Sequence, residues 1–161
     1  MKQIWIVAFL LLLSACASKP PLPEQMPTLT LPMQLHIEKQ QAGQQQDWLL
    51  VIQREGDSLR WSMLDPLGIP QARQLLRQRQ WSADGLLPPN PQARELFAAV
   101  LFALTPADEL QHNYPGARQQ GNQRQLNERW RVTYLQPLAF TLKLQQGLRY
   151  QVSPLPSETT P

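Results

Sequence analysis

Alternating apolar and polar residues run through the middle of this chain and constrain its fold more than any other feature. In a β-strand, successive side chains point to opposite faces, so such alternation indicates a strand with one apolar face. The pattern recurs in five runs, at residues 34–38, 59–63, 130–134, 140–144 and 148–152, and a sixth strand-like run, residues 48–52, is apolar on both faces. Short turn sequences such as Glu55-Gly56-Asp57-Ser58 lie between runs. We therefore predict an antiparallel sheet with a clear apolar face.

One helix is expected to interrupt the strands, over residues 91–104. Asn90 can cap its N-terminus, and Pro91 suits the first helical position. Its apolar residues recur on one helix face, at Ala93, Leu96, Phe97, Val100, Leu101 and Leu104. Residues 71–81 fit either a helix or a strand, and we favour a strand because a glycine-containing turn precedes them. The predicted fold is mainly β with α: a curved antiparallel sheet covered by one main helix.

The first fifteen residues have the order of a bacterial lipoprotein signal peptide. Lys2 supplies a positive charge, residues 4–13 are apolar, and Leu13-Ser14-Ala15-Cys16 fits a lipobox. The apolar stretch is about half of the 20 or so residues that a membrane-spanning helix needs. We therefore expect cleavage after residue 15 and acylation of Cys16, which anchors the chain to a membrane. Ala17, where aspartate would favour the inner membrane, points to the periplasmic face of the outer membrane.

Proline content divides the remainder of the chain. Residues 16–32 contain five prolines, which exclude a helix or a central strand, so we expect a lipidated cysteine followed by an extended tether. Residues 33–152 hold the alternating runs and form the expected folded domain. Residues 153–161 are again proline-rich and polar, and we expect a frayed tail.

Composition argues against several classes of function. After removal of Lys2, fourteen Lys and Arg residues remain against twelve Asp and Glu residues, a net charge of +2. The basic residues are scattered, with no basic stripe, so we expect no nucleic-acid partner. Cys16 is the only cysteine, so no internal disulfide can form in the oxidising periplasm. We expect no cofactor.

Two motifs with possible chemistry have simpler explanations. Gly56-Asp57-Ser58-Leu59 spells the signature of GDSL esterases, but a serine hydrolase also needs a histidine base near the serine. Glycine and aspartate between two alternating runs are typical of a hairpin turn, which we favour over a catalytic Ser58. His36 and Glu38 share one face of a strand, but two ligands without a third are weak evidence for a metal site. We expect no metal and no enzymatic activity.

The loop Asp65-Pro66-Leu67-Gly68-Ile69-Pro70 combines turn residues with two large apolar side chains. Leu67 and Ile69 can either fold back into the core or remain exposed at the loop tip. An exposed apolar tip would form a small wedge for a bilayer or for the apolar groove of a partner.

Residues 59–68 resemble the corresponding strand and loop of the LolB family, outer-membrane lipoproteins that receive other lipoproteins from the periplasmic carrier LolA. The loop in that family reads Asn-Pro-Leu-Gly, and here it reads Asp65-Pro66-Leu67-Gly68. Residues 127–134 and 147–152 are similar to its tryptophan-containing strand and its closing strand. The resemblance implies a half-open β-barrel with a helical lid and a cavity for acyl chains. Leu67 occupies the position of the leucine that is tied to delivery of cargo into the membrane.

The chain looks still more like a family of small bacterial lipoproteins of unassigned function, related to the LolA and LolB fold. Some of these are encoded with pathways for aryl polyene or unusual fatty-acyl products. Asp65 in place of asparagine, a second proline at Pro70 and a shorter chain depart from LolB. These departures make a specialised cargo as plausible as general lipoprotein sorting.

The sequence and the resemblance together predict a monomeric, non-enzymatic acceptor of acylated or polyene-like cargo, supplied by a LolA-like carrier. Leu67 and Ile69 would form the loop that contacts the membrane and releases cargo. The expected cavity-lining residues are Trp48, Leu50, Ile52, Trp61, Met63, Phe97, Val100, Leu101, Trp130, Val132, Phe140 and Leu142. The main alternative is an envelope assembly protein with a filled core and a protein partner. An esterase using Ser58 is a third hypothesis.

Overall fold

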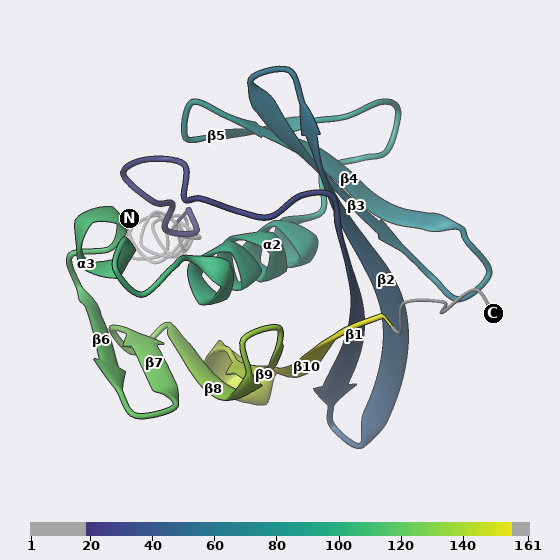
Figure 1. Cartoon of the computed structure of the whole chain (residues 1–161). Helices are drawn as coiled ribbons and strands as arrows, with labels where there is room; N and C mark the ends of the chain where they lie inside the picture. The colour runs from purple at the N-terminus through teal and green to yellow at the C-terminus, as the bar shows by residue number, and fades with distance from the viewer. Residues whose placement is uncertain (1–18, 156–161) are drawn as a thin grey trace, which may run out of the picture.

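A computed structural model describes residues 19–155 and shows ten strands and two α-helices (Figure 1). The first five strands are β1 (Met33–Gln41), β2 (Gln44–Glu55), β3 (Ser58–Leu64), β4 (Pro70–Arg77) and β5 (Gln80–Ala83). The helices α2 (Pro91–Leu104) and α3 (Leu110–Asn113) follow. The chain then forms β6 (Ala117–Gln120), β7 (Gln123–Leu126), β8 (Trp130–Gln136), β9 (Ala139–Lys143), the short 3₁₀ helix η2 (Gln145–Gly147) and β10 (Arg149–Pro154).

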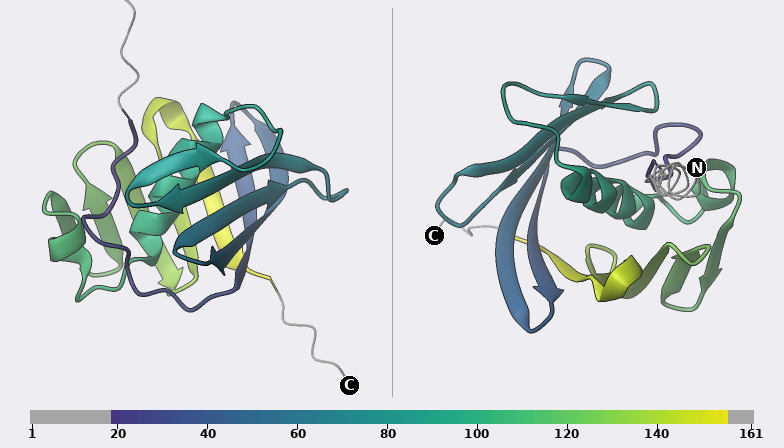
Figure 2. Two further views of the ribbon diagram at one scale, coloured as in Figure 1. Left: turned by 90° about the horizontal axis from the view of Figure 1, so that it is seen from above. Right: turned by 180° about the vertical axis from the view of Figure 1, so that it is seen from behind.

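All ten strands belong to one antiparallel sheet in the order β5-β4-β3-β2-β1-β10-β9-β8-β7-β6. The first and last strands of the domain, β1 and β10, pair with each other and join its two halves. The sheet does not close, since β5 and β6 are its two edges. It curves around α2, as Figures 1 and 2 show from three sides. The predicted fold class, a curved antiparallel half-barrel with one main helix, is confirmed.

Helix α2 begins where the sequence predicts. The Oδ1 atom of Asn90 accepts a hydrogen bond from the backbone N–H of Ala93 at 3.0 Å, and Pro91 occupies the first turn. The helix ends at Thr105, whose N–H donates to Leu101 O.

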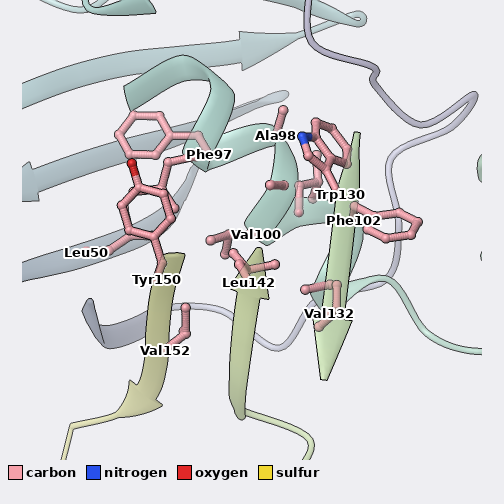
Figure 3. Packing of buried hydrophobic residues seen from close by; sticks show 14 of the residues in the cluster. Leu50, Phe97, Ala98, Val100, Phe102, Trp130, Val132, Leu142, Tyr150 and Val152 are labelled. Atoms are coloured by element: carbon pink, nitrogen blue, oxygen red, sulfur yellow. The ribbon is translucent and has the colours of Figure 1, made fainter. Parts of the chain in front are cut away.

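Burial of α2 goes further than the predicted one-sided stripe. Every residue from Leu96 to Ala103 is buried, including Ala98, Ala99 and Phe102, which lie outside the predicted stripe. The curved sheet encloses the helix on several sides, so side chains around its whole circumference meet apolar neighbours. Figure 3 shows α2 side chains directed toward those of β8, β9 and β10.

The strand predicted in the ambiguous stretch is confirmed, because residues 71–81 contribute to β4 and β5. The hairpin of β6 and β7 was not predicted. Each of these strands has four residues; six of the eight side chains are polar, and four of those six are exposed. Alternation of this length and polarity carries too little signal to mark a strand.

An arginine from this unpredicted hairpin closes the C-terminal end of α2. Arg124 on β7 is 4% exposed, and its Nη1 atom donates to the carbonyls of Phe102 at 2.8 Å and Thr105 at 2.7 Å. Its Nε and Nη2 atoms donate to Gln119 Oε1. A cation at this position satisfies carbonyls that a helix end leaves unpaired and opposes the negative end of the helix dipole.

Residues 19–32, called the strap below, contain no helix or strand but lie against the domain. The Glu24 carboxylate forms an ion pair of 2.7 Å with Arg79, in the turn between β4 and β5. The Glu24 N–H donates to Asn113 O at 3.1 Å, and the Gln25 N–H donates to Asn113 Oδ1 at 2.8 Å. Pro23 and Pro27 are buried. The strap therefore connects the β4–β5 hairpin with α3, which precedes the opposite edge strand (Figure 1).

Candidate functional site

The loop between β3 and β4 is organised around one carboxylate. The Oδ1 atom of Asp65 accepts hydrogen bonds from the N–H groups of Leu67 and Ile69, both at 2.9 Å. The backbone N–H of Asp65 donates to Ile69 O at 3.0 Å, and that of Gly68 donates to Asp65 O at 2.9 Å. Gly68 has a φ of +80°, a conformation that glycine adopts without steric cost. The loop therefore has a defined shape.

This shape leaves the two apolar side chains in solvent. Leu67 is 85% exposed and Ile69 is 53% exposed. Of the two arrangements that the sequence allowed, burial of both side chains in the core is wrong, and exposure at the tip is confirmed. A fixed loop that presents a leucine and an isoleucine has the character of a contact surface for an apolar partner or a bilayer.

The residues predicted to line a cavity lie together in the hydrophobic core. Trp48 is half-buried, and the other eleven are buried: Leu50, Ile52, Trp61, Met63, Phe97, Val100, Leu101, Trp130, Val132, Phe140 and Leu142. They come from β2, β3, α2, β8 and β9, so the structure brings together residues from both halves of the sheet and the helix. Their role as lining of a cavity stays a prediction.

A cleft of about 1060 Å³ lies beside the N-terminal end of α2, and we call it the α2 cleft. Its volume lies just above the range typical for small-molecule sites, roughly 300–1,000 Å³. Its apolar lining consists of Pro20, Leu22, Trp81, Pro91, Leu144 and Leu148. Its charged lining consists of Lys19, Arg79, Arg94, Glu95 and Arg129, and five glutamines complete it: Gln78, Gln80, Gln92, Gln145 and Gln146.

The lining as a whole comes from the strap, the β4–β5 turn, the first turns of α2, Arg129 before β8 and the β9–β10 connection. No single stretch of sequence contains the cleft, so the sequence analysis missed it. Only the folded sheet brings these five segments together.

An ion pair on one side of the α2 cleft joins the helix to the sheet. Glu95 of α2 accepts hydrogen bonds from Arg129 Nε at 2.7 Å and Arg129 Nη2 at 2.6 Å. The Glu95 Oε1 atom also accepts from Trp130 Nε1 at 2.7 Å. The hydrogen bond to Glu95 raises the pKa of Arg129 above its usual value. Both side chains of the pair are about one-quarter exposed or less, so this contact is shielded in part from solvent.

Arg94, the residue before Glu95, joins the helix to β4. Its Nε atom donates to Gln74 Oε1 at 2.9 Å, and Gln74 is 2% exposed. This hydrogen bond does not use the two terminal nitrogens of the guanidinium group. Arg94 can therefore bind a second acceptor without losing its contact to the sheet.

Three aromatic rings link the lining of the α2 cleft to the core: Trp81 lines the cleft, and Trp61 and Phe97 belong to the core. The ring centroid of Trp61 lies 5.8 Å from that of Trp81 and 5.5 Å from that of Phe97, and Trp81 lies 6.0 Å from Phe97. The Nε1 atoms of Trp61 and Trp81 are buried and have no hydrogen-bond partner within residues 19–155. Buried donors without an acceptor are uncommon in folded proteins, and they mark this region as one where an acceptor would be favourable.

Ser58 is the first residue of β3 and directly follows the turn at residues 56–57, within the stretch 55–58 where the sequence predicts a turn. Its Oγ atom lies 3.3 Å from Asp57 Oδ1 as a hydrogen-bond donor. His36 Nε2 lies 2.8 Å from Asp47 Oδ1, across the β1–β2 pair. Among residues 19–155, no hydrogen bond joins Ser58 to a histidine, and no group of three or more His, Cys, Asp or Glu side chains could hold a metal ion.

Cys16 and the predicted signal peptide lie outside the described residues, as do residues 156–161 of the predicted tail. Within residues 19–155, no helix has the length and hydropathy needed to cross a membrane.

A family model described as "Protein of unknown function (DUF3261)" matches residues 32–149. The chain belongs to the DUF3261 family. The match extends from the residue before β1 to the first residue of β10, so the DUF3261 region includes α2 and nearly all of the sheet. A search of curated proteins finds no match to the chain. The description of DUF3261 assigns no activity.

Proposed function

We propose that the chain is a membrane-anchored, non-enzymatic acceptor of acylated or polyene-like cargo at the periplasmic face of the outer membrane. The loop at residues 65–70 carries this proposal. Asp65 fixes the loop, and Leu67 is 85% exposed at its tip. An apolar side chain that is held in solvent by a polar network has no role in the core, and transfer into a bilayer would stabilise it.

The architecture supports a ligand with a long apolar chain. An open sheet encloses α2, and the α2 cleft joins solvent to the aromatic rings at the edge of the core. Burial of each methylene group stabilises a complex by about 0.8 kcal/mol. A chain of acyl type can therefore move from a carrier to a more apolar acceptor without an energy source.

The resemblance to the LolB family supports the same function. Residues 59–68 form β3 and the start of the exposed loop, which is the part of the chain that resembles LolB. Acylation of Cys16 would attach the domain to the membrane, and a diacylglyceryl group with an amide-linked chain gives a stable anchor. A LolA-like periplasmic carrier would supply the cargo.

The burial of the predicted cavity residues favours a second candidate function. Eleven of the twelve are buried in one core, as a protein with a filled interior requires. In that case the chain is an envelope assembly protein, and the exposed loop contacts a protein partner. Uptake of acyl probes separates the two candidates, because a filled core binds none.

Substitution of Leu67 tests the proposal. In the Cys16→Ala chain, Leu67→Glu replaces the exposed apolar side chain with a charge, and we expect flotation with liposomes and cargo transfer to fall about tenfold, given the burial free energy of a leucine. Leu135→Glu is the matched control, because Leu135 is 83% exposed near the C-terminal end of β8. Both variants should fold as the parent does, since each side chain is in solvent. Equal transfer by the parent and both variants would count against the proposal.

A further inference from the structure

The charges around the α2 cleft are unequal. Four cationic side chains line it, those of Lys19, Arg79, Arg94 and Arg129, against the single carboxylate of Glu95. Glu24, which pairs with Arg79, reduces this excess from three charges to two. The chain as a whole carries +3 over 161 residues, so the cleft concentrates much of the net charge in one place. A cleft lined by an excess of one charge attracts ligands of the opposite charge.

The N-terminal end of α2 adds to the positive charge of the α2 cleft. Pro91 and Gln92 of its first turn line the cleft, and that turn contains no acidic residue. The N-terminal end of a helix carries a partial positive charge, which favours an anion beside it. Arg94 retains two terminal nitrogens after its hydrogen bond to Gln74, and a guanidinium group can bind a carboxylate or phosphate through two parallel hydrogen bonds.

An apolar wall begins next to these cations. Trp81, Leu144 and Leu148 line the same cleft, and the ring of Trp81 contacts Trp61 and Phe97 of the core. Trp81 Nε1 is a buried donor without an acceptor among residues 19–155. The α2 cleft therefore combines an anion-binding end with a route along aromatic and aliphatic side chains.

We infer that the α2 cleft binds the head group of an anionic acyl amphiphile, with a carboxylate or phosphate near Arg94 and the first turn of α2. The acyl chain lies along Trp81, Leu144 and Leu148. This inference rests on the proposed function and narrows the cargo from acylated molecules in general to those with an anionic head group at the end of the chain. It also assigns Arg94 as the residue that selects the charge.

Photoreactive amphiphiles test the inference on the full chain in nanodiscs of phosphatidylcholine. All probes carry the same acyl chain of roughly sixteen carbons with a diazirine. They differ only in the head group, which is a carboxylate, a phosphate, a hydroxyl or a trimethylammonium group. We expect the two anionic probes to label peptides that contain Trp81 or residues 144–148 about tenfold more than the neutral and cationic probes. The carboxylate and phosphate arms identify which anion is preferred.

Arg94→Gln should reduce anionic labelling about fivefold or more and leave labelling by the neutral probe unchanged. The unchanged neutral labelling shows that the variant is folded. Arg118→Gln is the matched control, because Arg118 is exposed on β6 and does not line the cleft. Its labelling should equal that of the parent chain.

Equal labelling of the cleft by anionic and neutral probes would overturn the head-group inference and leave the proposed function standing. Labelling that Arg94→Gln and Arg118→Gln reduce equally would overturn it as well. Absence of labelling by every probe would overturn both the inference and the proposed function.

Discussion

Arg124 connects the sheet to the main helix. Its guanidinium group reaches from β7 to the last carbonyls of α2 and lies 5.7 Å from the ring centroid of Phe102 and 5.5 Å from that of Tyr134. Burial lowers the pKa of Arg124 below its usual value. Removal of the side chain would leave buried carbonyls of the helix end without a donor, and unsatisfied buried groups are costly.

Replacement of Arg124 by methionine keeps much of the side-chain volume and removes the donors. We expect Arg124→Met to lower the free energy of unfolding by about 3 kcal/mol, measured by urea denaturation. Arg118→Met, on the exposed face of the neighbouring strand, should change it by less than about 0.5 kcal/mol. Equal stability of the two variants would show that the contacts of Arg124 to α2 contribute little.

At the scale of elements, the strap is the segment whose attachment is easiest to test. Asn113 of α3 is 3% exposed, and its side chain accepts the hydrogen bond from the Gln25 N–H. Asn113→Ala removes this acceptor and leaves the backbone contact between Glu24 and residue 113 in place. We expect amide hydrogen exchange at Gln25 to accelerate about fivefold, the equivalent of one hydrogen bond of about 1 kcal/mol.

His112→Ala is the control for the strap, because His112 is the exposed neighbour of Asn113 on the same helix. Exchange at Gln25 should not change in that variant. Unchanged exchange in Asn113→Ala would mean that the Asn113 side chain contributes little to holding the strap, and that its other contacts, such as those of Glu24 and of Thr28 with Glu109, are sufficient.

The elements that the sequence predicts are those with long, regular patterns. The helix at 91–104 has a capping asparagine, a proline in its first turn and a repeating apolar stripe, and the longer strands have strict alternation. The β6–β7 hairpin has neither, because its strands are short and Arg124 occupies a buried position that alternation assigns to an apolar residue. The contacts of the strap with the domain could not be predicted either, because prolines indicate an extended backbone but not which residues that backbone will contact.

The whole molecule is an open sheet curved around a buried helix, and its interior holds several tyrosine hydroxyls. Burial raises the pKa of Tyr114, Tyr134 and Tyr150 above the usual value near 10. For Tyr134 the pKa rises to about 12. The Tyr134 hydroxyl donates to Ala103 O at 2.7 Å, close to the end of α2 that Arg124 also contacts.

These shifts predict a loss of stability in strong alkali. Above pH 10 the unfolded chain releases tyrosine protons while the folded chain retains them, so the free energy of unfolding should fall as the pH rises from about 10 to about 12. Below pH 10 the contribution is fully present. Tyr134→Phe loses one hydrogen bond, about 1 kcal/mol at pH 7, and should lose less further stability over the alkaline range than the parent chain. An identical alkaline slope for both would contradict the assignment of the shift to Tyr134.

At this scale the candidate site was only partly predictable. The 65–70 loop is contiguous in sequence, so its turn residues and its two apolar side chains could be recognised together, although their exposure could not. The α2 cleft depends on the curvature of the sheet, which brings residue 81 and residues 144–148 to one end of α2. Local periodicity contains no information about such distant neighbours.

Direct analysis of bound molecules tests the central claim, that this chain accepts acyl cargo. The mature chain from residue 16, with Cys16→Ala, would be purified from cells without detergent and measured by native mass spectrometry, followed by solvent extraction. We predict a co-purified acyl or polyene molecule at close to one per chain, or uptake of an added fatty-acyl probe at that ratio. A mass equal to the protein alone, with no uptake of any acyl probe, would contradict the account and favour a filled core with a protein partner.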